Sequence, residues 1–295
     1  MKLAAIDIGS NAARLLITDV FLDKKKQPEF IKSNLIRVPL RLGFDVFETG
    51  EISAERANCL LETMKAYRNL LTAYNVKHLK ACATSAMRDA RNSKDLIQQV
   101  KKETNIEIEI ISGDREASMI YETHIAETLE KDILYLYIDV GGGSTELTFF
   151  LNSKVIFKQS FNIGTIRLLK QQVKEELWEE MKEVIKTQVK GAKKVMTIGS
   201  GGNINKVFSL SKRKEGKPLP LDLLRDYYKE MSSLSLQERM SLFKMREDRA
   251  DVIVPALLIY VNVLKWAGAD EILIPKIGLA DGLIHALYDE LVNGL

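Results

Sequence analysis

The stretch from Ile133 to Leu151 reads ILYLYIDVGGGSTELTFFL and decides the fold. Two apolar, β-rich runs flank a turn of glycine, serine and threonine, a pattern typical of a β-hairpin. Asp139 lies at the end of the first run, two residues before Gly141. A glycine turn lets backbone N–H groups converge without obstruction by Cβ atoms, and such a nest holds phosphate oxygens. The stretch therefore predicts a hairpin that carries an anion site.

The start of the chain repeats this pattern. Residues 2–20 read KLAAIDIGSNAARLLITDV, so Asp7 again ends an apolar run two residues before a glycine, and a polar turn and a second run follow. The two copies lie about 130 residues apart, which is one domain length. We therefore predict a duplicated α/β domain, with domains at 1–128 and 129–295 and a boundary near Glu127 to Lys131.

Hydrophobic periodicity places further elements in each copy. Ser53 is a good N-cap for a helix that continues to Tyr74. The first copy is expected to contain strands at 30–42, 78–84 and 106–111 and helices at 54–74, at 92–103 and from near Asp114. The second is expected to contain strands at 133–138, 147–151, 154–160 and 195–198 and helices at 177–190 and after Asn203. Each copy is thus an α/β domain with a mixed sheet.

The composition excludes several classes of protein. The 295 residues carry 43 Lys and Arg against 40 Asp and Glu, and a formal net charge of +3 is too mild for a DNA-binding face. Two cysteines cannot form a disulfide framework and suit a reducing cytosol. The apolar stretch 252–268 contains Pro255, Asn262 and Lys265 and is shorter than a bilayer span. We expect a cytoplasmic protein with no membrane segment.

The chemistry is expected to come from carboxylates, backbone amides and a hard metal ion. The three histidines are far apart in the sequence, and there is no P-loop and no nucleophile elbow. The turn at Gly141, Gly142, Gly143, Ser144 and Thr145 supplies amides and hydroxyls for phosphate, and Ser10 and Asn11 supply them in the first copy. Asp139 and Glu146, at the two ends of the turn, can bind Mg²⁺ directly or through water, and Asp7 can add a third carboxylate.

Three further features have two interpretations each. Arg88 follows a predicted strand, where it is either a surface ion-pair partner or a phosphate contact at the carboxyl end of the sheet. Glu116 lies in the first turn of a predicted helix, where it either interacts with the helix dipole or acts as a general base that aligns water. The third glycine loop, around Gly201, is either a phosphate site at a helix N-terminus or a close-packed turn. The basic segment 212–220 is expected to be a solvated connector.

Together the motifs resemble the exopolyphosphatase/guanosine pentaphosphate phosphohydrolase (Ppx/GppA) family in its short, two-domain form. The resemblance covers essentially the whole chain and rests on seven motifs in family order: AIDIGSN at 5–11, ATSAMRDARN at 83–92, SGDREA at 112–117, IDVGGGSTEL at 138–147, IGTIRL at 163–168, IGSGGN at 198–203 and DRADVIVPA at 248–256. It implies two ribonuclease H-like domains of the actin/Hsp70/sugar kinase superfamily around a central cleft, and Mg²⁺-dependent release of terminal phosphate from inorganic polyphosphate or pppGpp.

The resemblance also implies a role for each matching residue. Glu116 matches the family's catalytic glutamate, and Arg88 matches an arginine of the phosphate site. Asp139 and Glu146 match the acidic residues linked to metal. The remaining matches are to phosphate-binding loops, namely Gly141 to Thr145, Asp7, Ser10, Asn11 and Gly201. A homodimer is compatible with the resemblance, but no sequence feature fixes it.

Three departures from the family pattern leave other functions open. Ala12 stands where the family often has serine, Asn203 where it often has threonine, and Ala280-Asp281 where it commonly has Arg-Glu. Because of Ala12 and Ala280-Asp281, an alarmone or polyphosphate sensor with little hydrolysis is the main alternative. An ATP-dependent small-molecule kinase of the same superfamily is a third. The sequence does not decide between polyphosphate and pppGpp, and the short form predicts a bias towards short chains or nucleotides.

Overall fold

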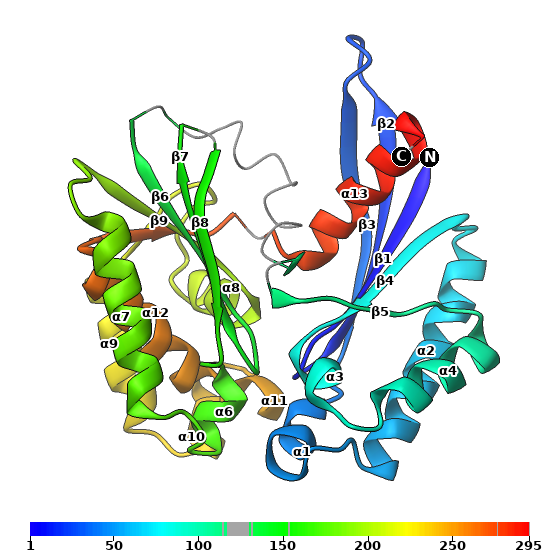
Figure 1. Ribbon diagram of the computed structural model, residues 1–295, viewed down its shortest axis with the longest axis horizontal. Helices are drawn as coiled ribbons and strands as arrows, with labels where there is room; N and C mark the ends of the chain where they lie inside the picture. The colour runs from blue at the N-terminus through cyan, green and yellow to red at the C-terminus, as the bar shows by residue number, and fades with distance from the viewer. Residues whose placement is uncertain (114, 117–129, 131, 153, 276, 295) are drawn as a thin grey trace. The chain divides into compact units, whose positions relative to one another are not determined.

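The computed structural model describes residues 1–113, 115–116, 130, 132–152, 154–275 and 277–294. The chain forms two compact units, one of Met1–Thr123 with Gly278–Leu295 and the other of His124–Ile277. Each unit is built on one sheet, and Figure 1 labels the elements of both.

The first unit contains a five-stranded sheet in the order β3-β2-β1-β4-β5. Its strands are β1 (Lys2–Ile8), β2 (Ala13–Leu22), β3 (Pro28–Val38), β4 (His78–Ala83) and β5 (Glu109–Ile110). Strands β1 to β3 form an antiparallel meander, and β4 and β5 continue the sheet parallel to β1. The helices are α1 (Leu42–Thr49), α2 (Ala54–Ala73), α3 (Ser85–Asp89), α4 (Ser93–Thr104) and α13 (Leu279–Asn293).

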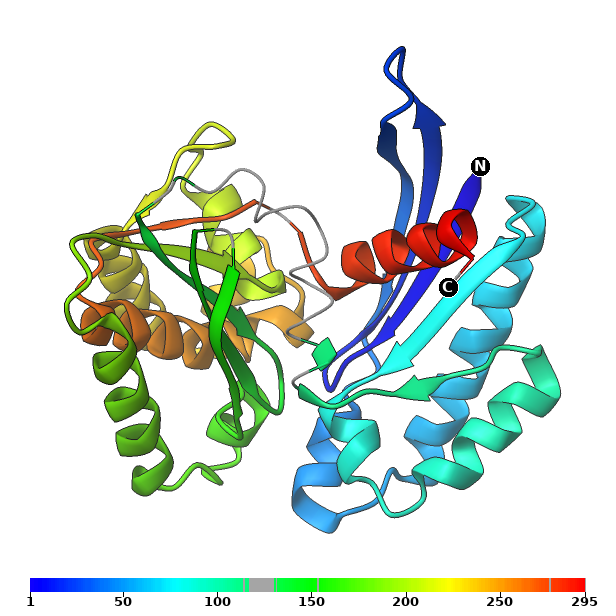
Figure 2. The same cartoon turned by 45° about the horizontal axis from the view of Figure 1, so that its top comes forward.

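The C-terminal helix α13 belongs to the first unit, although the sequence prediction placed residues 278–295 in the second domain. Alternation along β1 turns Leu3 and Ala5 to one face of the sheet. There they share a buried cluster with Leu283 and Ile284 of α13. Figure 2 shows α13 lying along this sheet. Residues 278–295 therefore belong to the first unit and not to the second, because the apolar face of α13 is buried against the first sheet. The predicted boundary itself, at residues 128 and 129, falls outside the described residues.

The second unit contains a six-stranded sheet in the order β10-β11-β9-β6-β7-β8. Its strands are β6 (Leu134–Val140), β7 (Thr145–Leu151), β8 (Lys154–Phe161), β9 (Val195–Ser200), β10 (Leu219–Pro220) and β11 (Glu271–Leu273). Its helices are α6 (Thr165–Leu169), α7 (Glu175–Val189), α8 (Gly202–Leu210), α9 (Leu221–Ser232), α10 (Leu236–Leu242), α11 (Glu247–Ala250) and α12 (Ile253–Ala267).

The two sheets confirm the predicted duplication. Strands β8-β7-β6-β9-β11 repeat the order and the directions of β3-β2-β1-β4-β5, and β10 is an addition at the edge. The registers match as well, since Asp7 lies opposite Cys82 on the parallel neighbour and Asp139 lies opposite Ser200. Each unit is therefore a ribonuclease H-like α/β domain. The cleft expected between the copies stays a prediction.

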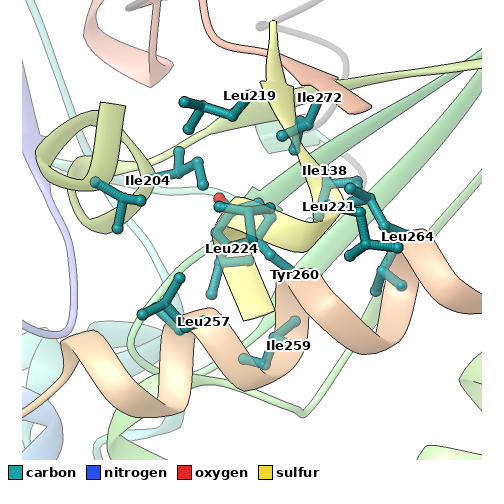
Figure 3. Packing of buried hydrophobic residues seen from close by; sticks show 14 of the residues in the cluster. Ile138, Ile204, Leu219, Leu221, Leu224, Leu257, Ile259, Tyr260, Leu264 and Ile272 are labelled. Carbon is teal, nitrogen blue, oxygen red and sulfur yellow. The ribbon is translucent and has the colours of Figure 1, made fainter. Parts of the chain in front are cut away.

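Helix α12 lies in the core of the second unit. The helical stretch Glu247–Ala267 is long and apolar enough, by length and composition, to cross a membrane. In this fold, however, Leu257, Tyr260 and Leu264 pack with Ile138 and Ile204 in the buried cluster of Figure 3. This is the packing of a core helix, so the stretch gives no reason to place the chain in a membrane.

The structure also differs from the predicted elements. The predicted strand 30–42 ends at Val38, and the unpredicted helix α1 follows it. Helix α3, directly after β4, was not predicted, and β5 covers only two residues of the expected strand 106–111. Of the helix predicted to start near Asp114, residues 113, 115 and 116 are helical, and Asp114 lies outside the described residues. Short elements such as α1 and α3 offer too few residues for a periodic signal. The longer helices α9, α12 and α13 were not assigned from the sequence either.

Candidate active site

The first glycine turn joins β1 and β2. It is closed by a hydrogen bond of 3.0 Å from the N–H of Gly9 to the carbonyl of Ala12. Ser10 is buried, and its Oγ lies 2.7 Å from Oγ of Ser85 at the start of α3. The turn predicted to hold phosphate therefore lies at the carboxyl ends of β1 and β4, the edge where open α/β sheets bind ligands.

The backbone carbonyls of this turn are tied to the segment that follows β3. The N–H of Gly43 donates to the carbonyl of Ser10 at 2.8 Å, and the N–H of Arg41 donates to that of Asn11 at 3.0 Å. Arg41 adopts the left-handed conformation, with φ 55°, as it begins α1. Helix α1, which the sequence did not reveal, thus fixes the position of the turn.

Asp7 forms an ion pair with Arg14. The carboxylate is buried, and its Oδ2 lies 2.6 Å from Nη1 of Arg14, which is directly opposite on β2. A carboxylate held by a guanidinium is a weaker candidate for a metal ligand than one that faces a second acid. The sequence carried a signal for this difference, because Arg14 follows Asp7 by the same seven residues that separate Glu146 from Asp139.

Arg88 and Glu116 lie near the carboxyl ends of β4 and β5. Nη1 of Arg88 donates to the carbonyl of Ile111 at 3.1 Å. Glu116, which is half-buried, follows Ile111 by five residues in the chain. Burial raises the pKa of the Cys82 thiol well above its ordinary value, and the charges of Asp7 and Glu116 raise it further. The hydrogen bonds of Arg88 and Ser10 place these residues at the carboxyl ends of β4 and β5 and of β1 and β4, respectively.

The second glycine turn, between β6 and β7, has the same closure. The N–H of Gly141 donates to the carbonyl of Ser144 at 2.9 Å, as Gly9 does to Ala12. None of the hydrogen bonds between described residues uses the N–H of Gly142 or Gly143. Amides without a partner in such a turn suit an anion.

The carbonyls of this turn are held by the start of α6. The N–H groups of Thr165 and Ile166 donate to the carbonyls of Gly141 and Gly142 at 3.0 and 2.8 Å. The side chain of Arg167 donates from Nε to the carbonyl of Gly143 at 2.8 Å. The IGTIRL motif, to which sequence reasoning assigned no role, therefore fixes the phosphate turn from behind.

Gly164 allows this close approach. A Cβ atom at this position would lie 2.4 Å from the carbonyl oxygen of Gly142 and 2.4 Å from the carbonyl carbon of Gly143. Real Cβ atoms do not approach backbone atoms this closely, so only glycine fits between α6 and the turn without moving one of them.

Asp139 and Glu146 lie directly opposite each other on β6 and β7. They are 9% and 2% exposed, and opposed positions project to the same face of a sheet. Ser144 and Ser160 donate from Oγ to Oε1 of Glu146 at 2.6 and 2.8 Å and so orient that carboxylate. One or two carboxylates, completed by water and phosphate oxygens, are the donor set that Mg²⁺ takes, so these residues fit the ion. The described residues contain no group of three or more His, Cys, Asp or Glu side chains that could hold a metal alone.

Gly201 of the third glycine loop packs beside the carboxylate of Asp139. Gly201 adopts φ 117°, and a Cβ there would lie 3.5 Å from Oδ1 of Asp139 and 3.1 Å from the carbonyl oxygen of Val140. The second unit therefore brings together Asp139, Glu146, the turn 141–145 and Gly201. Of the two interpretations of the third loop, its packing role is visible, and its phosphate role stays a prediction.

The departures from the family pattern have packing roles. Ala12 and Ala280 are buried, the latter in the cluster under α13. Asp281 accepts a hydrogen bond from the N–H of Gly278 at 3.0 Å and pairs with Nζ of Lys32 at 2.7 Å. Asn203 accepts a hydrogen bond from Arg249 at 2.7 Å. All four side chains serve local structure.

Comparison with known proteins identifies the family. The sequence model of the Ppx/GppA phosphatase family matches residues 34–291. The chain belongs to this family. A bifunctional 3-dehydroquinate synthase/phosphatase of Fusobacterium nucleatum is 28% identical over 323 residues, which cover 98% of this chain and 46% of that relative. The chain thus spans less than half the length of this relative.

Solved structures of Ppx/GppA proteins agree over the whole chain. An exopolyphosphatase from Cytophaga hutchinsonii is 27% identical, with a TM-score of 0.83 over 100% of this chain and 99% of that one. The Aquifex aeolicus family member is 26% identical, with a TM-score of 0.75 over 100% and 98%. The fold predicted from the sequence is the fold of these family members.

Proposed function

We propose that this Ppx/GppA family member is a Mg²⁺-dependent phosphohydrolase that releases the terminal phosphate of inorganic polyphosphate or of pppGpp. The observation that carries the proposal is the turn 141–145, whose carbonyls are tied back by α6 and whose two ends carry the opposed acids Asp139 and Glu146. Such a turn offers amides to a phosphate and carboxylates to its counterion.

Hydrolysis of a phosphoanhydride depends on positioning and charge stabilisation more than on a covalent nucleophile. In the proposed reaction, the N–H groups of the turn and the hydroxyl of Ser10 hold phosphate oxygens, while the Ser144 hydroxyl donates to Glu146. Arg88 neutralises charge on the substrate, and Glu116 aligns the attacking water and accepts its proton.

Mg²⁺, when bound through Asp139 and Glu146, would supply charge neutralisation at the phosphates. The chain's own contribution is to fix the two carboxylates. The hydroxyls of Ser144 and Ser160 keep Oε1 of Glu146 in place, and Gly201 packs beside Oδ1 of Asp139.

The sensor alternative draws no support from the residues that suggested it. Ala12 and Ala280 fill buried positions, and Asp281 caps α13 and pairs with Lys32. The proposal includes a cytoplasmic location and a role in the stringent response, because polyphosphate and pppGpp are intracellular anions. A homodimer stays a prediction.

Phosphate release by the purified protein with Mg²⁺ tests the proposal, with tripolyphosphate, long-chain polyphosphate and pppGpp compared side by side. Glu116→Gln should lower the rate by about 10²- to 10⁴-fold, the usual contribution of a general base. Glu103→Gln is the matched control and should keep the wild-type rate, because Glu103 of α4 forms a surface ion pair with Lys65 of α2. No release from any substrate, or equal rates for wild type and Glu116→Gln, would refute the proposal.

A further inference from the structure

Tyr260 of α12 holds the strand that leads into the third glycine loop. Its hydroxyl donates to the backbone carbonyl of Ser200, the last residue of β9. The ring is 1% exposed and packs among the core side chains of Figure 3. Burial raises the pKa of Tyr260, and the nearby charge of Asp139 raises it further, so this phenol stays a donor. The end of β9 is therefore anchored to the core helix α12.

Arg249 of α11 holds the other side of the same loop. Its Nη1 donates to Oδ1 of Asn203 at 2.7 Å. Its guanidinium also lies so close to Gly202 that a Cβ there would be 2.6 Å from Nη2. Residues 202 and 203, which begin α8, are thus covered and bonded by one side chain.

Gly201 lies between these two anchors and against Asp139. Tyr260 fixes the residue before it and Arg249 fixes the two residues after it. A Cβ at Gly201 would contact Oδ1 of Asp139 and the Tyr260 hydroxyl, each at 3.5 Å. The space beside the Asp139 carboxylate therefore depends on where the loop is held.

We propose that Tyr260 and Arg249 are positioning residues for the metal site, which hold the third glycine loop so that Gly201 confines the Asp139 carboxylate. Neither residue ligates the ion. They act through the loop, as partners outside the ligand set act on a metal site by restricting its ligands. This inference rests on the proposed function, because it takes Asp139 and Glu146 as the metal ligands.

The test measures binding of Mn²⁺, a substitute for Mg²⁺, to the substrate-free protein by the electron paramagnetic resonance signal of the free ion. Tyr260→Phe and Arg249→Lys should each raise the Kd about tenfold, the lower end of the effect of residues that orient metal ligands. Tyr67→Phe is the matched control, because this buried phenol donates to backbone carbonyls of Ala13 and Ile36 in the other unit. It should lower the melting temperature similarly and leave the Kd within twofold of wild type.

Asp139→Asn separates this inference from the proposed function. If Asp139→Asn abolishes Mn²⁺ binding while Tyr260→Phe and Arg249→Lys bind like wild type, the positioning role is wrong and the metal site stands. If Asp139→Asn binds like wild type, the metal site itself is wrong, and the inference falls with it. Arg249→Lys keeps the test decisive should Tyr260→Phe not fold, since Arg249 is only partly buried.

Discussion

Substitution of Gly164 by alanine tests whether α6 positions the phosphate turn. The new Cβ would lie 2.4 Å from the carbonyl oxygen of Gly142, whereas ordinary contacts begin at 3.4 Å. The turn or α6 must therefore move by about 1 Å. Gly164 has φ −131°, extended backbone that any residue adopts, so the clash is the only cost.

A displacement of about 1 Å at a reacting group costs about 100-fold in rate. Overpacking of this kind costs about 1–3 kcal/mol in stability. We therefore expect Gly164→Ala to release phosphate about 100-fold more slowly. Each kcal/mol lost should lower the melting temperature by about 2–4 °C. The assay is phosphate release from tripolyphosphate and pppGpp at saturating Mg²⁺, with the folded fraction measured by circular dichroism.

Gly191→Ala is the control with a comparable loss of stability. Gly191 adopts φ 81° with nothing within 4 Å of an added Cβ, so alanine there costs about 1–2 kcal/mol in backbone strain and touches no part of the turn. Full activity of Gly191→Ala is expected. If Gly164→Ala loses no more activity than Gly191→Ala, the claim that α6 positions the turn is refuted.

Three further results are expected. Ser160→Ala removes one of the two hydroxyls that orient Glu146 and should weaken Mn²⁺ binding about tenfold, measured by calorimetry. Leu283→Ala, in the core under α13, should lower the free energy of unfolding by about 2–5 kcal/mol in urea. Because burial raises the pKa of Cys82 above its ordinary 9.0, the unfolded chain loses this proton first as pH rises. Stability from this group is complete below about pH 9 and should fall above it by about 1.4 kcal/mol per pH unit, and Cys82→Ala should remove that slope in urea titrations at pH 8 to 10.

Matched variants decide each of these results. Ser209→Ala, at an exposed position of α8, should leave Mn²⁺ binding unchanged. If Ser160→Ala also leaves Mn²⁺ binding unchanged, Ser160 does not orient the Glu146 carboxylate. Leu242→Ala, at an exposed leucine, should cost little, and an equally small cost at Leu283 would show that α13 does not share the core. A pH slope that persists in Cys82→Ala would assign it to other groups.

The hairpins and the acids at their ends were predictable because their signals are local. Runs of apolar residues around a glycine turn specify β1-β2 and β6-β7, and the seven-residue spacing across a hairpin places Asp139 opposite Glu146. The anchors of the turns were not predictable. Gly43, Thr165 and Arg249 lie far along the chain from the residues that they hold, and no periodic pattern marks a single hydrogen bond.

The sequence by itself determined that one α/β domain occurs twice, that each copy carries a glycine turn, and which acids flank the turns. Tertiary structure decided the rest. It placed α13 on the first sheet, because its apolar face is buried against Leu3 and Ala5. It also made the copies unequal, since Asp7 faces a guanidinium while Asp139 faces a carboxylate. Pairing across strands determines which side chain a buried carboxylate faces, and this pairing depends on the register in the folded sheet.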